Sequence, residues 1–232
     1  MKLRSALLAA ALVLGCSAAS AITLVGTVYD KVANGADFEG PITGLTTGMV
    51  SSTLVGGLPQ FVGPNGAGGV PNAAAFDLWW QNTHGAMAIN LPLTEGPAGV
   101  FKYQNSSFFP IAAYGFHFTM KLAGQTSFTA ADSFTFTGDD DLWIYIGDKL
   151  VMDLGGVHAA ESRTITGANL MALGLSENTV YDLDIFFAER HTTQSNFNIT
   201  TTFRVSEVPE PGMLALLGVA LFGVAAVRRR QA

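Results

Sequence analysis

The chain has 232 residues, of which 49% are hydrophobic, and it carries 12 basic and 18 acidic side chains. Between Ile22 and Val208 there are 17 acidic and 7 basic side chains, a net charge of −10. Such a surface repels phosphate backbones, which argues against nucleic-acid binding. It also repels acidic polysaccharide unless a divalent cation lies between the two.

Residues 1–21 have the pattern of a secretory signal peptide. Lys2 and Arg4 supply positive charge, an apolar stretch follows, and Ala19-Ser20-Ala21 provides the small residues of a cleavage site. We therefore expect the mature chain to begin near Ile22. The one cysteine of the sequence, Cys16, lies in the removed segment, so the exported protein has no disulfide and depends on its core.

Residues 22–208 are predicted to form one all-β domain, an antiparallel β-sandwich with few short helices. The reason is that short alternating segments recur between Gly, Asn and Pro residues, without a long helical period. We expect Gly63–Gly69 to be a loop, and Ile42–Thr53 to be a short helix or irregular. The expected strands, other than a central hairpin, are Ile22–Tyr29, Met87–Leu93, Ser133–Thr137, Tyr181–Phe187 and Phe197–Val205.

A hairpin is predicted over Leu142–Ile146 and Lys149–Leu154, joined by Gly147-Asp148. Glycine at the first turn position favours a type II′ turn. Alternate residues of the first strand are apolar on both faces, which is typical of a strand in the middle of a covered sheet. Trp143 is accordingly expected in the core, as are Trp79 and Trp80.

Gly138-Asp139-Asp140-Asp141 joins two predicted strands at the rim of the sandwich. Three adjacent carboxylates repel one another, and the repulsion becomes attraction if a hard cation such as Ca²⁺ is held there. A solvated acidic turn explains the same residues equally well. The spacing does not match an EF-hand, so a second loop has to supply further ligands.

Glu189-Arg190-His191 follows a buried run, and Asp153 and His158 bracket a pair of glycines. These side chains either line a ligand cavity or form a network that anchors loops, and we favour the anchoring role. Arg190 is expected to pair with Glu189, Asp153 or the Asp triplet. One of Asp153 and His158 is a candidate to reach the metal.

The sequence offers little support for catalysis. Asp153 and Glu189 are the pair that would act in a glycosidase, but nothing in the sequence fixes their separation. There is no Gly-x-Ser-x-Gly motif, and the four histidines lack the short spacing of zinc ligands.

The C-terminal residues 209–232 contain Pro209, Glu210 and Pro211, an apolar run of 16 residues, and then Arg228, Arg229 and Arg230. The run spans roughly 24 Å, which makes a short transmembrane helix with the arginines held in the cytoplasm. This tail resembles the PEP-CTERM sorting signal of Gram-negative bacteria that make exopolysaccharide. The resemblance implies transient membrane insertion and removal of the tail by an exosortase, whereas an ordinary C-terminal anchor is the alternative.

The domain itself resembles the bacterial fibro-slime domain, which is similar to the β-sandwich of anthrax protective antigen and of yeast flocculin adhesins. The matching segments are residues 26–30, 37–39, 108–111, 134–146, 149–158 and 186–197. The resemblance implies that Asp139 and Asp140, joined by a cis peptide, bind Ca²⁺, and that Ca²⁺ in turn coordinates sugar hydroxyls. Asp141 stands where the family often has Gly, and Asn196 in the loop Thr192–Asn196 is expected to be a further ligand.

These observations favour an exported calcium-dependent carbohydrate-binding or adhesion module that acts on extracellular polysaccharide at the cell surface or in a biofilm matrix. A structural matrix protein in which calcium only rigidifies loops is the alternative. A polysaccharide-processing hydrolase is a third hypothesis.

Overall fold

The computed structural model describes residues 21–111 and 115–207, so the predicted sorting tail and nearly all of the signal peptide lie outside the described residues. Within those ranges, eleven strands form one antiparallel sheet in the order β7-β6-β9-β4-β1-β2-β3-β10-β5-β8, with β11 paired to β4. The strands are β1 (Ala21–Asp30), β2 (Ala86–Glu95), β3 (Phe101–Asn105), β4 (Phe118–Ser127), β5 (Ser133–Gly138), β6 (Asp141–Ile146), β7 (Lys149–Leu154), β8 (Glu161–Thr166), β9 (Tyr181–Glu189), β10 (Phe197–Thr201) and β11 (Arg204–Ser206).

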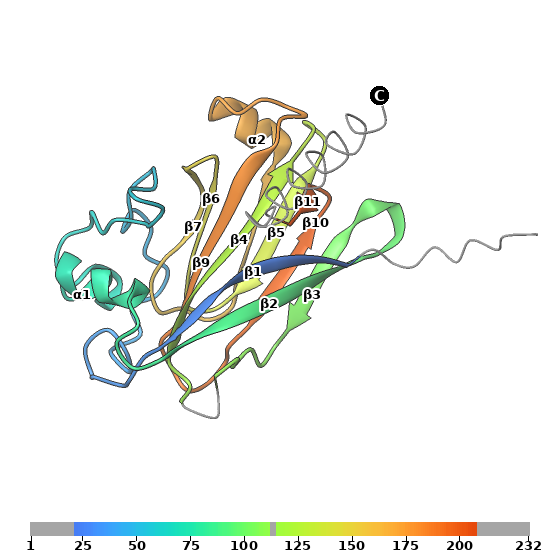
Figure 1. Cartoon of the computed structure of the whole chain (residues 1–232). Coiled ribbons are helices and arrows are strands. Elements are labelled where there is room, and N and C mark those ends of the chain that lie inside the picture. The colour runs from blue at the N-terminus through green and yellow to red at the C-terminus, as the bar shows by residue number, and fades with distance from the viewer. Residues whose placement is uncertain (1–20, 112–114, 208–232) are drawn as a thin grey trace, which may run out of the picture.

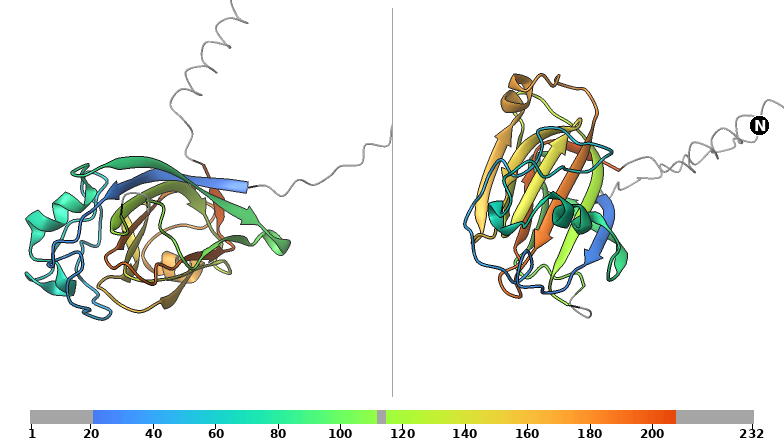
Figure 2. Two further views of the ribbon diagram at one scale, coloured as in Figure 1. Left: turned by 90° about the horizontal axis from the view of Figure 1, so that it is seen from below. Right: turned by 90° about the vertical axis from the view of Figure 1, so that its left-hand side faces the viewer.

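The sheet curls until its two halves face each other, and Figure 2 shows the strands nearly closing around the interior. One half contains β7, β6, β9 and β4, and the other contains β3, β10, β5 and β8. Aromatic and aliphatic side chains fill the space between the halves, among them Phe118, Phe136, Phe187 and Phe197. The predicted all-β sandwich is therefore confirmed.

Helices are few and short. They are η1 (Ala67–Gly69), α1 (Ala73–Asp77), η2 (Leu78–Trp80), η3 (Pro97–Gly99) and α2 (Gly167–Ala172). Helix α2 begins at a capping box, in which the Thr166 side chain accepts from the backbone of Asn169 and the Asn169 side chain accepts from the backbone of Thr166. None of the helices in the described ranges is long and apolar enough to cross a membrane.

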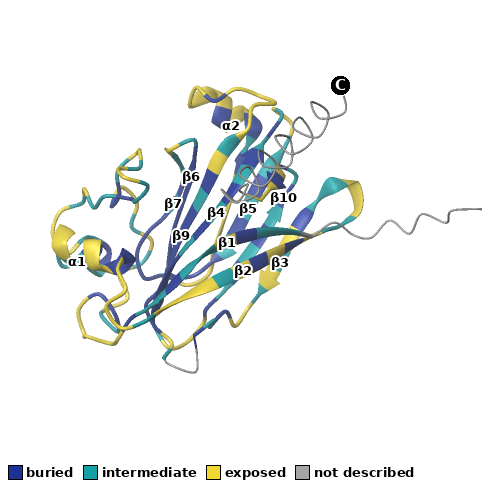
Figure 3. Ribbon diagram, in the orientation of Figure 1, coloured by how far each residue is buried: buried dark blue, intermediate teal, exposed yellow. Residues whose placement is uncertain are grey.

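Strand β6 is buried on both faces, as its sequence predicts. Leu142, Ile144 and Ile146 point into the core between the halves, whereas Trp143 and Tyr145 point outward into a second apolar cluster. Residues 31–80, here called the outer layer, cover this second cluster from the left of Figure 1. Trp79 and Trp80 lie in it and are 1% and 6% exposed, which confirms them as core residues. Figure 3 shows the resulting dark band of buried residues along β6 and β9.

Three local predictions differ from the structure. The hairpin turn is type I′, because Asp148 (φ 62°) adopts a left-handed conformation as Gly147 (φ 55°) does, so the predicted type II′ turn is wrong. The last predicted strand is broken after β10, and β11 pairs with β4, which lies in the other half of the sheet. No described peptide bond is cis, including the one between Asp139 and Asp140. The segment Ile42–Thr53 is irregular.

Candidate functional site

Three connections cross between the two halves of the sheet at the same end of the molecule, here called the rim. They are β5–β6, β7–β8 and β9–β10. The strand register places these connections at the same end, since Asp141 at the start of β6 pairs with Ala188 at the end of β9. In the facing half, Gly138 at the end of β5 pairs with Phe197 at the start of β10. Residues far apart in the sequence therefore meet at the rim.

A hollow of about 190 Å³ lies at the rim and is here called the rim hollow. Its lining includes four of the predicted site residues, Asp139, Asp140, His158 and His191. Gln194 from the β9–β10 connection contributes a further polar side chain. The structure thus brings together residues that the sequence separates by more than fifty positions.

The Asp triplet is buried, with Asp139, Asp140 and Asp141 only 3%, 5% and 0% exposed, so it is not a solvated acidic turn. Each carboxylate accepts hydrogen bonds from another rim loop. Asp139 accepts from the backbone and the side-chain amide of Asn196, the latter at 2.9 Å, and Asp140 accepts from the backbone N–H of Arg190 at 2.9 Å. Asp141 accepts from Gly156. The triplet therefore fastens three connections together.

Four acidic side chains, those of the Asp triplet and of Glu189, are gathered at the rim. Burial raises the pKa of Asp139, and burial together with the charge of Asp141 raises the pKa of Asp140. Glu189, 1% exposed, has its pKa raised by burial and then by the charge of Asp140. Its Oε2 atom has no hydrogen-bond partner within the described residues. A cation bound beside Asp139 and Asp140 would offset the cost of burying their ionised forms.

Arg190 is the cation that the fold itself provides, and it faces away from the rim hollow. Its Nη1 lies 3.1 Å from Asp141 Oδ2, and it donates to the backbone carbonyls of Asp37 and Gly68 in the outer layer. Its guanidinium also lies 5.1 Å from the centre of the Trp79 ring. Arg190 thus joins the Asp triplet to the outer layer, as expected of a side chain that anchors loops rather than one that lines a ligand cavity.

Asp153 and His158 differ in position. Asp153 accepts from Trp143 Nε1 at 3.0 Å and from the backbone N–H of Gly48 at 2.7 Å, and it does not line the rim hollow. His158 lines the hollow, and its two ring nitrogens lie 2.8 and 3.2 Å from the carbonyls of Ala159 and Leu154. Asp153 therefore anchors a loop, whereas His158 faces the candidate ligand space.

Sequence reasoning missed the site role of Glu39. Its carboxylate lies 2.8 Å from His117 Nε2 and 3.4 Å from His191 Nδ1, and it also accepts from the backbone N–H of Thr192. The hydrogen bond from His117 is the main reason why the pKa of Glu39 is lowered. Glu39 thus fixes the His191 side chain beside the rim hollow.

The fit of the rim to Ca²⁺ rests on oxygen atoms. Within residues 21–111 and 115–207, no three His, Cys, Asp or Glu side chains form a ready metal-binding group. Carboxylates of Asp139 and Asp140, the amide oxygen of Asn196 and backbone carbonyls are the oxygen donors that Ca²⁺ prefers. Glu189, whose Oε2 has no hydrogen-bond partner within the described residues, lies beside this set. These residues fit a hard cation.

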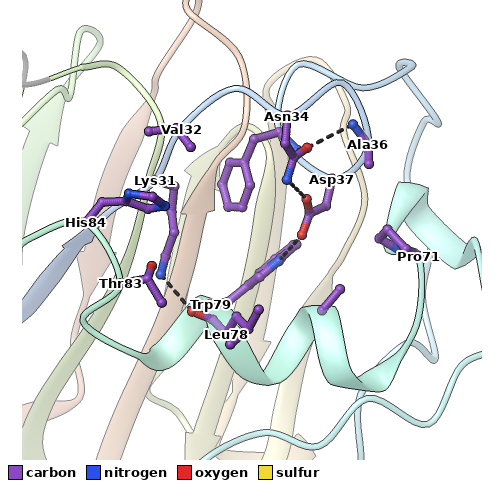
Figure 4. A pocket seen from close by; sticks show the side chains of 12 residues that line it. Lys31, Val32, Asn34, Ala36, Asp37, Pro71, Leu78, Trp79, Thr83 and His84 are labelled. Atoms are coloured by element: carbon purple, nitrogen blue, oxygen red, sulfur yellow. Dashed lines mark hydrogen bonds between the residues drawn. The ribbon is translucent and has the colours of Figure 1, made fainter.

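A second hollow of about 250 Å³ lies between the start of the outer layer and helix η2 (Figure 4). Buried Lys31 donates to the carbonyls of Leu78 and Gln81, and Trp79 Nε1 donates to Asp37 at 2.7 Å. Burial lowers the pKa of Lys31 to about 8. The polar groups of this second hollow are engaged in holding the outer layer together.

The PA14 domain is matched over residues 99–215, half of the chain, and the chain belongs to the PA14 domain family. The PEP-CTERM protein-sorting motif is matched over residues 207–230, which confirms the resemblance of the tail. The narrower fibro-slime resemblance stays a prediction.

Among curated proteins, the chain is similar to Protein psiD and Protein psiC of Dictyostelium discoideum. Each is 34% identical, over 78% and 81% of this chain and 41% and 42% of those proteins. The chain therefore spans less than half the length of these relatives.

Among solved structures, it is similar to the PA14 sugar-binding domain from RTX adhesin (10% identity, TM-score 0.38, covering 79% of this chain and 94% of that one). It is also similar to the Epithelial Adhesin 9 A domain from Candida glabrata in complex with Galb1-4GlcNAc (14% identity, TM-score 0.35, covering 85% and 94%).

Proposed function

We propose that the protein is a calcium-dependent carbohydrate-binding module, exported and sorted to the cell surface or the extracellular matrix, with the rim hollow as its binding site. The observation that carries this proposal is the pair of buried carboxylates, Asp139 and Asp140, that line the rim hollow. Charges of one sign are costly to bury together, and a bound divalent cation offsets that cost.

Calcium would be held by Asp139 and Asp140, with Asn196 as the amide ligand. Ca²⁺ takes six to eight oxygens, so positions beyond these ligands and backbone carbonyls are left for hydroxyl groups of a ligand. Gln194 supplies a hydrogen-bonding side chain in the lining of the hollow, and the rings of His158 and His191 form part of that lining. At about 190 Å³ the hollow is smaller than a drug-sized pocket of about 300 Å³ or more, which suits a single sugar ring.

The sorting motif supports the proposed location. An exosortase is the partner that a PEP-CTERM motif implies, and extracellular polysaccharide is the glycan that such an exported protein would meet. Substituting Glu210→Ala should leave the tail attached. Mass spectrometry of the exported protein would then find the full C-terminus, whereas a tail still removed from the variant would contradict this part of the proposal.

A thermal-shift titration of the purified protein with Ca²⁺ tests the metal site. At a Ca²⁺ concentration of about 100 times Kd, binding adds about 2.7 kcal/mol to the free energy of unfolding, which raises Tm by about 5–10 °C. The Asp140→Asn variant should lose this rise. Asp184→Asn is the matched control, because Asp184 is a carboxyl on β9 whose pKa burial also raises, and it does not line the hollow.

A glycan array with and without chelator separates the proposal from its alternatives. Calcium-dependent binding to a glycan supports the proposal. A rise in Tm with no glycan bound would instead identify a structural matrix protein. Hydrolysis of the glycan, lost on substitution of Asp153 or Glu189, would identify an enzyme.

A further inference from the structure

Residues 42–48, here called the rim loop, lack regular secondary structure and are nevertheless fixed against the β7–β8 connection. Gly44 donates to the carbonyl of Val157 at 2.9 Å, and the N–H of Val157 donates to the hydroxyl of Thr43 at 3.1 Å. Further along, Thr46 and Gly48 donate from their backbones to Gly155 O and to the Asp153 carboxylate. The rim loop therefore holds the side chains at its start in a fixed position.

The first residue of the rim loop is Ile42, whose side chain lines the rim hollow. It is 76% exposed, more than any other large hydrophobic side chain in the described ranges. Leaving an isoleucine in water forgoes the stabilisation that its burial would give. Single exposed aliphatic residues are common on protein surfaces and need no explanation by themselves. Ile42 differs because a hydrogen-bonded loop fixes it at the mouth of a polar hollow.

Val157 is the second aliphatic residue of the same lining, and it is only 3% exposed. Together the two side chains give the rim hollow an apolar wall, whereas Asp139, Asp140 and Gln194 supply polar groups elsewhere in its lining. A ligand that fills the hollow must therefore present both hydroxyl groups and an apolar surface. A pyranose ring meets both requirements when its hydroxyl groups lie toward one face and its C–H groups form an apolar opposite face.

The charges around the hollow limit the ligand further. One bound Ca²⁺ would balance Asp139 and Asp140, and Arg190 already balances Asp141. No surplus of positive charge then remains for a uronate or sulfate group, and the domain as a whole is acidic.

We infer that Ile42 is a specificity-determining residue, which packs with Val157 on the apolar C–H face of a neutral pyranose ring held in the rim hollow. This inference rests on the proposed function and names the ligand class of the same site. It assigns a role to an exposed side chain of the outer layer.

The test uses the full-length protein and the neutral glycan that it binds best on an array that includes uronic and sulfated glycans. Ile42→Ala should weaken binding about tenfold or more, the equivalent of about 1.4 kcal/mol, and Ile42→Leu should retain most of the affinity. The rise in Tm with Ca²⁺ should be the same in both variants and the parent. Leu78→Ala is the matched control, because Leu78 is an exposed aliphatic residue (50%) that lines the second hollow of Figure 4.

Three results would overturn the inference. They are an unchanged affinity in Ile42→Ala, a loss of affinity in Leu78→Ala that places the ligand in the second hollow, and a preference for anionic glycans. If calcium-dependent glycan binding persists at full strength in Ile42→Ala, the proposed function stands and only this inference fails. If the parent protein binds no glycan on the array, both fail together.

Discussion

Arg190 and Asp141 form an ion pair that is entirely inaccessible to water, with 3.1 Å between Nη1 and Oδ2 and both side chains 0% exposed. A buried pair of this kind contributes little net stability compared with apolar residues of the same shape. Its importance is geometric, because it joins the start of β6 to the β9–β10 connection and, through further hydrogen bonds from Arg190, to the outer layer.

Removing the positive charge of Arg190 while Asp141 stays should destabilise the folded protein. Arg190→Met leaves Asp141 buried without its partner, and such a loss costs about 3–5 kcal/mol of unfolding free energy. Urea denaturation would measure the change. Arg204→Met, at an exposed position on β11, is the control and should change stability by less than about 0.5 kcal/mol. An Arg190→Met protein as stable as the parent would show that the ion pair does not hold the rim together.

The acidic cluster predicts an unusual pH dependence in the absence of calcium. The folded state keeps a proton on Glu189, whereas the unfolded state releases it above about pH 4.3. The folded state therefore binds more protons, and stability falls as the pH rises, by about 1.4 kcal/mol per pH unit for one proton.

Glu189→Gln tests this assignment. Urea unfolding in chelator at pH 5, 6 and 7 should give a flatter fall in stability for the variant than for the parent. Glu161→Gln changes an exposed carboxyl on β8 and should leave the slope as it is. Parallel slopes in the parent and in Glu189→Gln would mean that Glu189 is ionised in the folded protein.

The hairpin turn offers a matched pair of substitutions. Gly147→Ala should destabilise the protein by more than about 1 kcal/mol, because the residue has a positive φ and a Cβ there would lie 2.9 Å from the Tyr181 ring. Asp148→Gly should stabilise it by about 0.5 kcal/mol, because glycine adopts positive φ without strain. Thermal unfolding of both variants checks the type I′ assignment. Equal changes in Tm in the two variants would contradict it.

The sequence predicts the strands well where the two-residue alternation of side chains is clear. The two faces of β6 could be assigned because both sets of alternate residues, those in line with Leu142 and those in line with Trp143, are apolar. Only a strand covered on both faces tolerates this pattern. The outer layer could not be predicted, because residues 31–80 have little regular structure and no period. Its position depends on Trp79 and Phe76 packing against Trp143, contacts between segments that are distant in the chain.

The candidate site was predictable in part. Three adjacent aspartates are unusual in sequence, so Asp139 and Asp140 could be singled out without a structure. The role of Glu39 could not, since a lone glutamate in an irregular segment resembles any surface residue. Its partners His117 and His191 come from the connections before β4 and after β9, and only the fold brings the three together.

The lining of the rim hollow runs from Ile42, near the beginning of the folded body, to Gln194, near its end. A chain that emerges from its N-terminus delivers Ile42 early and Gln194 almost last. Because both belong to one recess, that recess does not exist on a partly emerged chain. Ligand binding of the kind proposed for it would therefore begin only once synthesis and export of the body are all but finished.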